Sequence, residues 1–227
     1  MKKTELLSPV GDFECLKSAV QNGADSVYLG ASSFSARAYA NNFGAEELEK
    51  AVDYCHLRQV KVYLALNILV KNKEMQNALE LASQAYTMGV DALIIQDLGL
   101  AQLIHTNFPD FPLHASTQMT VHNLAGVQAL EKLGFRRVVL ARELSLREIA
   151  YIRAHTTMEL EVFVHGALCI SYSGRCLISS LIGGRSRKSW KMCSGLSFAL
   201  YSLSRSKINR QGILVKSKRY LCFTLSC

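Results

Sequence analysis

The sequence predicts an α/β protein, an incomplete TIM-like (β/α) barrel of about seven βα units with an irregular C-terminal tail. Short aliphatic or β-branched runs alternate with longer stretches in which apolar residues recur at positions i, i+3, i+4 and i+7. The alternation repeats roughly every 25 to 30 residues, as strand-helix units of a barrel do. The strand-like runs are continuously apolar, which is typical of a parallel sheet covered on both faces. An open doubly wound sheet is the second possible architecture.

The strand-like runs follow one another at regular intervals, and "DSVYLGA", "KVYLALNILV" and "VDALIIQD" are the clearest of them. Strands are expected within residues 4–11, 25–31, 61–70, 90–97, 112–119, 135–143 and 160–167. No comparable unit follows residue 186, so the barrel is expected to stop one unit short of closure and to leave an unpaired edge.

Helical stretches lie between the expected strands, and "AEELEKAVDYCHLRQ" shows the apolar spacing well. Helices are expected within residues 12–24, 45–59, 73–89, 98–108, 123–134 and 144–156. Gly23, Gly89 and Gly134 stand just before the next strand, where a helix commonly ends on a glycine in the left-handed conformation. These signals divide the first 186 residues into repeating units.

Polar residues stand just past the expected strand ends, and in a barrel they would converge on the catalytic face. They are Ser8, Ser32 to Arg37, Asn67, Asp97, Gln118, Arg142, Glu143 and His165.

The net charge of +8 is unevenly distributed. Residues 187–227 contain nine Lys and Arg and no acidic residue, whereas all 18 Asp and Glu lie in residues 1–186. The basic excess therefore belongs to the tail, and the part expected to fold is nearly neutral. We divide the chain into a barrel domain, 1–186, and a basic tail, 187–227, expected to be disordered.

The seven cysteines do not form a recognisable disulfide framework, because the count is odd and Cys15 and Cys55 lie within amphipathic helical patterns. The start of the chain has no apolar signal core, and no apolar run reaches the ~18 residues that a bilayer span needs. We therefore expect a cytoplasmic protein with no membrane partner.

Cys169 and Cys176 lie in the loop "HGALCISYSGRC", which follows the last expected strand. Thiolates are soft ligands for zinc or iron-sulfur clusters. The spacing matches neither a zinc finger nor a ferredoxin, so two unrelated, partly buried thiols are the alternative. The position at the carboxyl end of a strand favours a ligand role.

Three residues at strand ends are candidates for catalysis: His165, Arg37 and Glu143. His165 could act as an acid or base, or be a histidine with a purely structural partner. Arg37 could grip an anionic substrate group or pair with a nearby acid. Arg142 and Glu143 could instead form a structural ion pair. No known hydrolase motif is present.

Several blocks resemble peptidase family U32, the collagenase-like proteases, over residues 4–186. The cysteine segment "ELEVFVHGALCISYSGRCLISSLIGGRS" carries the resemblance most specifically, and "YLALNILV", "HASTQMTVHN" and "VVLARELSLREI" are similar to other blocks of the family.

The resemblance implies a barrel-like domain, and several members are oxygen-independent hydroxylation proteins that act on tRNA, rRNA or a quinone precursor. It also implies a 4Fe-4S cluster on four cysteines, with Cys169 and Cys176 as the first two ligands. RNA or a small molecule would be the substrate, in a site lined by the polar strand ends. Proteolysis, as the family name says, and an inactive truncated fragment are the alternatives.

The resemblance ends at Ser186, where the family continues approximately Gly-Asn-Arg-Gly-Lys-Cys. Trp and Met have one codon each, so "WKMC" is encoded by TGG AAR ATG TGY, which in the next frame forces Gly, then Lys or Arg, then Cys. We infer a frameshift near Ser186, which makes the tail out-of-frame and the cluster site incomplete. Cys193 falls close to the position of the third ligand and is the remaining candidate.

Overall fold

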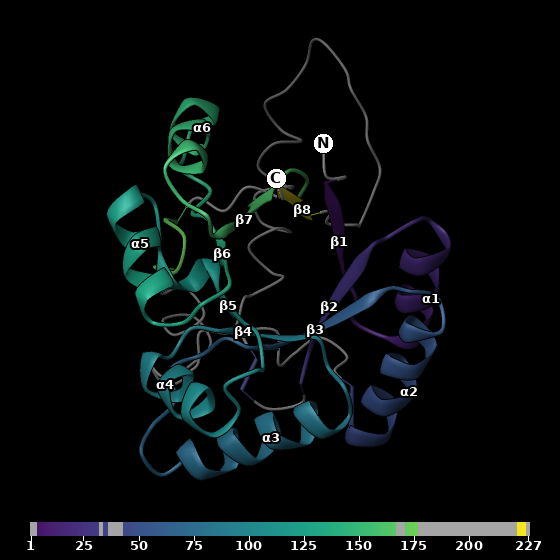
Figure 1. Ribbon diagram of the computed structural model, residues 1–227. Coiled ribbons are helices and arrows are strands. Elements are labelled where there is room, and N and C mark those ends of the chain that lie inside the picture. The colour runs from purple at the N-terminus through teal and green to yellow at the C-terminus, as the bar shows by residue number, and fades with distance from the viewer. Residues whose placement is uncertain (1–3, 32–33, 36–42, 167–170, 177–221, 226–227) are drawn as a thin grey trace, which may run out of the picture.

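A computed structural model describes residues 4–31, 34–35, 43–166, 171–176 and 222–225 of the chain. Seven parallel strands form most of a barrel, and six helices surround it (Figure 1). The TIM-like α/β class and the seven parallel strands predicted from the sequence are confirmed. Within the described residues, no helix is long and apolar enough to cross a bilayer.

Each expected helix and the first six expected strands form inside their predicted ranges, whereas β7 begins one residue earlier than expected, at Glu159. The order along the chain is the order around the barrel. The parallel strands are β1 (Glu5–Pro9), β2 (Ser26–Gly30), β3 (Lys61–Leu66), β4 (Ala92–Ile95), β5 (Leu113–Ala115), β6 (Arg137–Val139) and β7 (Glu159–Phe163). The helices are α1 (Phe13–Gln21), α2 (Ala45–His56), α3 (Met75–Thr87), α4 (Leu98–Asn107), α5 (Leu124–Lys132) and α6 (Leu146–Ala154). A 3₁₀ turn, η1 (Thr117–Met119), occupies the end of the fifth expected strand.

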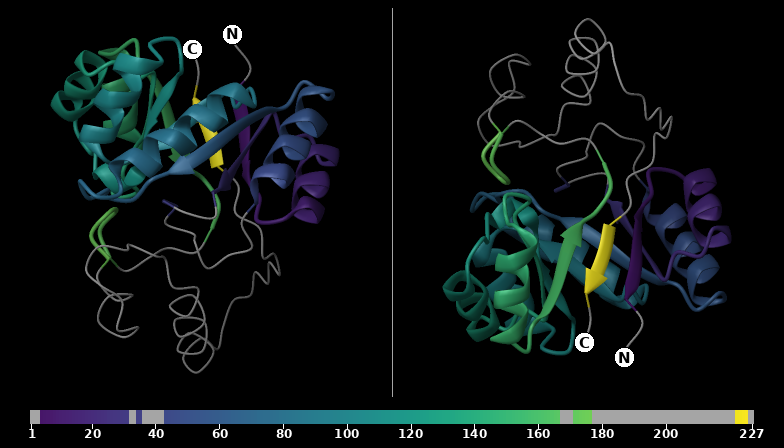
Figure 2. Two further views of the ribbon diagram at one scale, coloured as in Figure 1. Left: turned by 90° about the horizontal axis from the view of Figure 1, so that it is seen from below. Right: turned by 90° about the horizontal axis from the view of Figure 1, so that it is seen from above.

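The expectation of an unpaired sheet edge is wrong. A short strand, β8 (Cys222–Leu225), lies between β7 and β1, pairs with both, and closes the barrel. It runs antiparallel to them, and Figure 2 shows it in yellow, pointing opposite to β7. Because both edge strands present unpaired N–H and C=O groups, a short extended segment suffices to satisfy them without an eighth βα unit. The remainder of the predicted tail lies outside the described residues.

Local sequence explains where the helices begin and end. The Asp12 side chain accepts the N–H of Cys15 and caps α1, and Ser145 with Glu148 forms a capping box at α6. The three predicted helix-ending glycines have φ between 81° and 87°, a conformation that strains any residue with a Cβ. The positions at which these helices begin and end therefore follow from the sequence.

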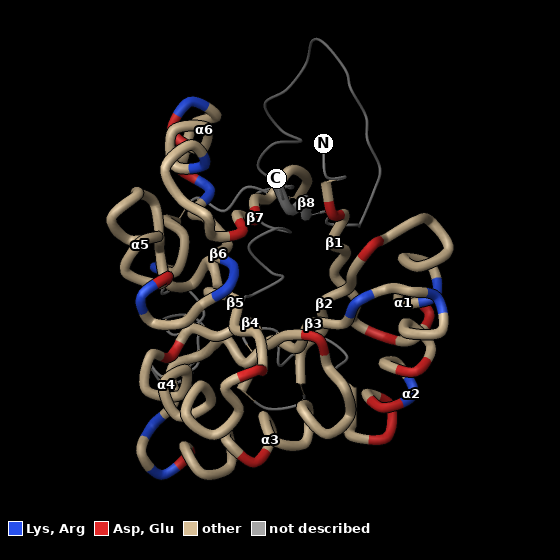
Figure 3. Tube along the Cα trace, viewed as in Figure 1, with Lys and Arg blue, Asp and Glu red and all other residues tan. Residues whose placement is uncertain are grey.

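The main hydrophobic core lies between the strands and the surrounding helices, where leucine, isoleucine and valine side chains are almost fully buried. A second, smaller cluster is formed by side chains of neighbouring strands: Leu7, Tyr63, Ala65, Ala92 and Ile94. The two clusters explain why the strands are apolar on both faces. Charged residues are found mainly on the helices and loops (Figure 3).

A buried ionic cluster lies next to the closing strand, and we call it the Arg137 cluster. Arg137 is 3% exposed and binds Glu5 of β1 through Nη2 at 2.9 Å and Glu159 of β7 at 2.6 Å. Glu161 lies 3.7 Å from its Nη1, and the Tyr63 hydroxyl donates to Glu5 at 2.6 Å. Figure 3 shows acidic positions on β1 and β7 and a basic stretch near β6. The cluster thus joins β1, β6 and β7 across the position of β8.

The Arg137 cluster makes the stability of the barrel sensitive to acid. Burial opposes the charge on Glu5, but the hydrogen bonds and charge of Arg137 outweigh it and lower the pKa of Glu5 from 4.5 to about 2. A depressed pKa stabilises the fold above pH 4.5, and this contribution is lost as the pH falls from there toward 2. We expect the free energy of unfolding to drop by up to about 3 kcal/mol over this window.

Urea unfolding at pH 7, 4 and 3 measures this drop, and Glu5→Gln is the comparison, because the amide does not titrate. The variant should be less stable at pH 7 and should lose less stability than the wild type on acidification. Equal pH slopes for the two proteins would show that Glu5 is not the group responsible.

Candidate functional site

The segment 171–176 packs against the carboxyl ends of the strands, the end that carries the active site in TIM barrels. Figure 2 shows it on the side of the barrel toward which β7 points. Gly174 has φ +72°, and a Cβ there would overlap the carbonyl oxygen of Gln118 and lie 2.6 Å from the Thr120 hydroxyl. Only glycine combines this backbone conformation with such a close approach. The segment is therefore held against the loop that follows β5.

Ser173 is the anchor of this segment and is 1% exposed. Its N–H donates to Glu143 Oε1 at 2.9 Å, and its hydroxyl lies 3.3 Å from the same oxygen. The N–H of Arg142 donates to the Ser173 hydroxyl at 3.1 Å, and the guanidinium also reaches Ser173 and the carbonyl of Ser171. Arg142 and Glu143, considered as an ion pair at the sequence level, thus both hold the segment at Ser173.

The loop after β5 holds the same segment from the other side. The Thr120 hydroxyl donates to the Ser173 carbonyl oxygen at 2.8 Å. The Thr120 carbonyl is 2.9 Å from Nδ1 of His122, and because a carbonyl only accepts, Nδ1 carries the proton. In the neutral ring this leaves Nε2 as an acceptor. Thr120 has φ +58°, a left-handed conformation that is uncommon for a residue with a Cβ.

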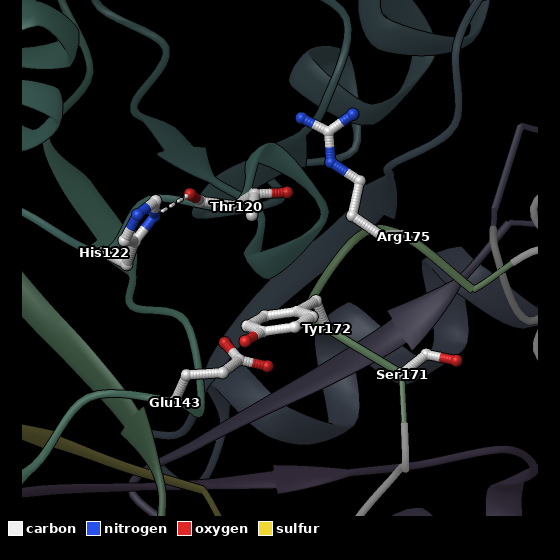
Figure 4. A pocket seen from close by; sticks show the side chains of 6 residues that line it. All are labelled: Thr120, His122, Glu143, Ser171, Tyr172 and Arg175. Atoms are coloured by element: carbon white, nitrogen blue, oxygen red, sulfur yellow. Dashed lines mark hydrogen bonds between the residues drawn. The ribbon is translucent and has the colours of Figure 1, made fainter.

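These contacts surround an open pocket of about 470 Å³ (Figure 4). It is lined by Thr120, His122, Glu143, Ser171, Tyr172 and Arg175. The lining combines an aromatic ring, an imidazole, a guanidinium, a carboxylate and hydroxyls. Its volume falls in the range of about 300 to 1,000 Å³ that is typical of small-molecule sites.

Glu143 is ionised in this pocket. Its partial burial opposes the charge, but the hydrogen bonds from Ser173 and from its own backbone N–H, with the charge of Arg142, hold the pKa of the carboxyl below its usual value. An ionised carboxylate is an acceptor only. Glu143 therefore offers the pocket a negative charge and a hydrogen-bond acceptor near neutral pH.

Three buried polar atoms near the carboxyl ends of β4 and β5 have no hydrogen-bond partner in the described part of the chain. They are Gln96 Oε1, Thr117 Oγ1 and Gln118 Oε1. Buried polar atoms are rarely left without a hydrogen bond, and where the protein supplies no partner, water or a ligand commonly does. They mark the same end of the barrel as the pocket.

Among the candidate catalytic residues, the structure places only Glu143 in the pocket. His165 is exposed after β7 and is not among the residues that line the pocket. Arg37 lies outside the described residues, as do Cys169 and Cys193. Cys176 is described, as a free and partly buried thiol at the end of the anchored segment. The roles predicted for these residues stay predictions.

Other polar strand ends have structural partners. Asp97 caps α4 through the N–H of Leu100 at 2.9 Å and accepts the N–H of Val70 at 3.1 Å. Asn67 donates to the hydroxyl of Ser116 at 3.4 Å. These contacts tie together the loops after β3, β4 and β5, so they shape the rim of the barrel.

Sequence reasoning missed six residues that line or build the pocket: Thr120, His122, Ser171, Tyr172, Ser173 and Arg175. Two signals were present. The block "HASTQMTVHN" follows an expected strand, and "SYSGR" combines hydroxyl, aromatic and glycine residues. Neither signal says that the two loops contact each other, because their meeting depends on the close approach of Gly174.

The fold and the strand-end pocket define a protein of the TIM-barrel class. The sequence profile of peptidase family U32 matches residues 11–223. The chain belongs to this family.

Two relatives from Escherichia coli (strain K12) modify RNA according to their names. The chain is 42% identical to tRNA hydroxylation protein P over 186 residues, 82% of this chain and 41% of that protein. It is 40% identical to 23S rRNA 5-hydroxycytidine C2501 synthase over 184 residues, 81% of this chain and 28% of that protein. The chain thus spans less than half the length of these two relatives.

The fold is also similar to the solved structure of the U32 peptidase Mk0906. The TM-score is 0.58 at 18% sequence identity, and the match covers 68% of this chain and 66% of that one. This likeness concerns the fold alone.

Proposed function

We propose that the chain is part of an iron-sulfur-dependent, oxygen-independent RNA hydroxylation protein that acts on tRNA or rRNA. The observation that carries the proposal is the 40–42% identity to two proteins named for RNA hydroxylation. The mixed polar and aromatic pocket at the carboxyl ends of the strands supports it, because that face of a barrel is where substrates bind. Work on tRNA or rRNA would place the protein in the cytoplasm.

For the cofactor we propose a 4Fe-4S cluster held by Cys169 and Cys176, with Cys193 as a third candidate ligand. Cys176 fits such a role, since it is a free, partly accessible thiol on a segment fixed to the catalytic end of the barrel. A bound cluster would supply electron transfer and an iron centre beside the pocket. The residues of the chain would fix its position, because Ser173 anchors the backbone three residues before Cys176.

Proteolysis is less well supported by the same site. Peptide cleavage by a serine needs a hydroxyl that the substrate can reach and a base beside it. The hydroxyl of Ser173 lies near the Glu143 carboxylate, but Ser173 is 1% exposed and its bonds anchor the loop.

Complementation of a strain that lacks the gene tests the proposed function. Two coding sequences are compared: the chain as written, and a version in which the frame after Ser186 is corrected. RNA from the cells is digested to nucleosides, and mass spectrometry looks for a pyrimidine heavier by one oxygen atom. We expect this nucleoside with the corrected version and a loss of it with the chain as written. Gelatin cleavage without any modified nucleoside would instead support the peptidase, and an intact genomic frame at codon 186 would remove the frameshift hypothesis.

We expect Cys176→Ser to lose most of the iron that the chain can bind. Anaerobic reconstitution of the chain with the corrected frame after Ser186, using iron and sulfide, should give a brown protein, because thiolates are the ligands that such clusters require. The measurement is bound iron per chain together with visible absorbance. Cys15→Ser on α1 is the matched control, because Cys15 is an exposed cysteine that lies outside the segment 171–176. Equal iron in both variants would overturn the assignment of Cys176 as a ligand.

A further inference from the structure

We propose that the pocket beside the segment 171–176 binds one unpaired nucleobase of an RNA, with the ring of Tyr172 as the stacking surface and Glu143 as the hydrogen-bond acceptor. The inference rests on the proposed function and deepens it, because it names the part of the RNA that enters the site. Neither residue has a role in the cluster hypothesis. The pocket can therefore be tested in the absence of a cofactor.

Tyr172 is an exposed aromatic ring on a fixed backbone. It is 71% exposed, although the residues on both sides of it are hydrogen-bonded to Arg142. Its neighbour Ser173 is held by Glu143 and Thr120 as well. Proteins that bind single-stranded nucleic acid use such rings, since a base stacked on an aromatic side chain contributes about 1–3 kcal/mol. Because these hydrogen bonds already hold the backbone, less entropy is lost when a base binds.

Glu143 supplies the polar contact that stacking lacks. Its Oε1 receives the two contacts from Ser173, whereas Oε2 takes part in neither. Figure 4 shows the carboxylate directed toward the Tyr172 ring. A carboxylate accepts hydrogen bonds from N–H groups such as the exocyclic amine of cytosine or the ring N–H of uracil. These groups form the base-pairing edge, so the base must be unpaired to present them.

Arg175 and His122 complete the site for a nucleotide. Arg175 is exposed and extends away from Glu143 in Figure 4, in a position suited to a backbone phosphate outside the base pocket. The Nδ1–H of His122 donates to the Thr120 carbonyl, so Nε2 is the ring nitrogen that can contact a ligand. The pocket of about 470 Å³ has room for one base, and its polar contacts reach the base-pairing edge, which is hidden in a duplex. Binding therefore requires a single-stranded region or a base rotated out of its stack.

Fluorescence anisotropy with short labelled RNAs tests the inference on the full 227-residue chain. One oligonucleotide carries a central cytidine, a second has an abasic site at the same position, and a third is a duplex of the first. The variants are Tyr172→Ala, which removes the ring, and Tyr172→Phe, which keeps it. Tyr151→Ala is the matched control, because Tyr151 on α6 is also exposed, at 58%, and lies outside the pocket.

We expect Tyr172→Ala to weaken binding of the cytidine RNA roughly 5- to 30-fold, in line with the loss of one stacking contact. Tyr172→Phe and Tyr151→Ala should bind as the wild type does, and no variant should change the affinity for the abasic RNA. The duplex should bind more weakly than the single strand.

An equal effect of Tyr172→Ala on cytidine and abasic RNA would overturn the inference, as would a preference for the duplex. Either result is compatible with RNA hydroxylation, which the nucleoside measurement reports separately. If none of the labelled RNAs binds, the inference fails; if the nucleoside measurement also finds no modified pyrimidine, the proposed function fails as well. The two failures are therefore distinguishable.

Discussion

Replacement of Arg137 by alanine is expected to lower the free energy of unfolding by about 3–5 kcal/mol, the usual cost of removing one partner from a buried group of charges. Arg137 is 3% exposed and contacts carboxylates from both strands that flank β8. Its loss would leave Glu5 and Glu161, which are largely buried, without their compensating cation. Like charges would then face each other where the barrel closes.

The expected loss exceeds that of a surface ion pair because little water reaches the cluster. The guanidinium makes hydrogen bonds of 2.6 to 2.9 Å with Glu159 and Glu5, and these bonds, together with the nearby charge of Glu161, offset its desolvation. Burial lowers the pKa of Arg137, but the hydrogen bonds and charges of the carboxylates raise it above the ordinary value. The arginine therefore stays charged throughout the pH range in which the protein can be studied.

Arg136→Ala is the matched control for this prediction. Arg136 precedes Arg137 in the chain, is 63% exposed, and lies 3.6 Å from the same residue, Glu159. Exposed pairs contribute about 0–1 kcal/mol, so this variant should unfold at nearly the wild-type urea concentration. If the two alanine variants lose similar stability in urea unfolding, the Arg137 cluster does not hold the barrel closed.

The sequence predicts the seven parallel strands because each is a continuous apolar run. It predicts the helix ends because glycine adopts the left-handed conformation there without the strain that a Cβ would cause. It does not predict β8, whose four residues carry no strong pattern and take their conformation from the open edges of β1 and β7. It does not predict the Arg137 cluster either. Glu5 and Arg137 are 132 residues apart, and only barrel closure brings them together.

The candidate site was predictable in part. Its location at the strand ends follows from the fold, and Glu143 stood out as a polar residue just past a strand. Tyr172 did not, because an aromatic residue in a loop normally packs inward, and its exposure becomes evident only when the anchoring of Ser173 is known. The glycine that permits this anchoring, Gly174, is one of four glycines in residues 165–186, and nothing in the sequence distinguishes it from the other three.

Gly174→Ala is expected to detach the segment 171–176 from the barrel and to remove the pocket. Alanine in the left-handed conformation costs roughly 1–2 kcal/mol. The added Cβ would also overlap the carbonyl oxygen of Gln118, a backbone atom that cannot rotate away. If about 3 kcal/mol is lost in total, hydrogen exchange at the Ser173 N–H should accelerate about 100-fold, because this N–H is protected by its bond to Glu143.

Gly23→Ala separates the two causes of this effect. Gly23 has φ +87°, similar to the +72° of Gly174, but a Cβ at Gly23 meets nothing within 4 Å. The control therefore carries the conformational cost without the overlap, and exchange at Ser173 should stay at the wild-type rate. The affinity for single-stranded RNA should fall with Gly174→Ala at least as far as with Tyr172→Ala, since the whole segment that carries the ring is displaced. Unchanged exchange at Ser173 in Gly174→Ala would show that the contact with the loop after β5 does not fix the segment.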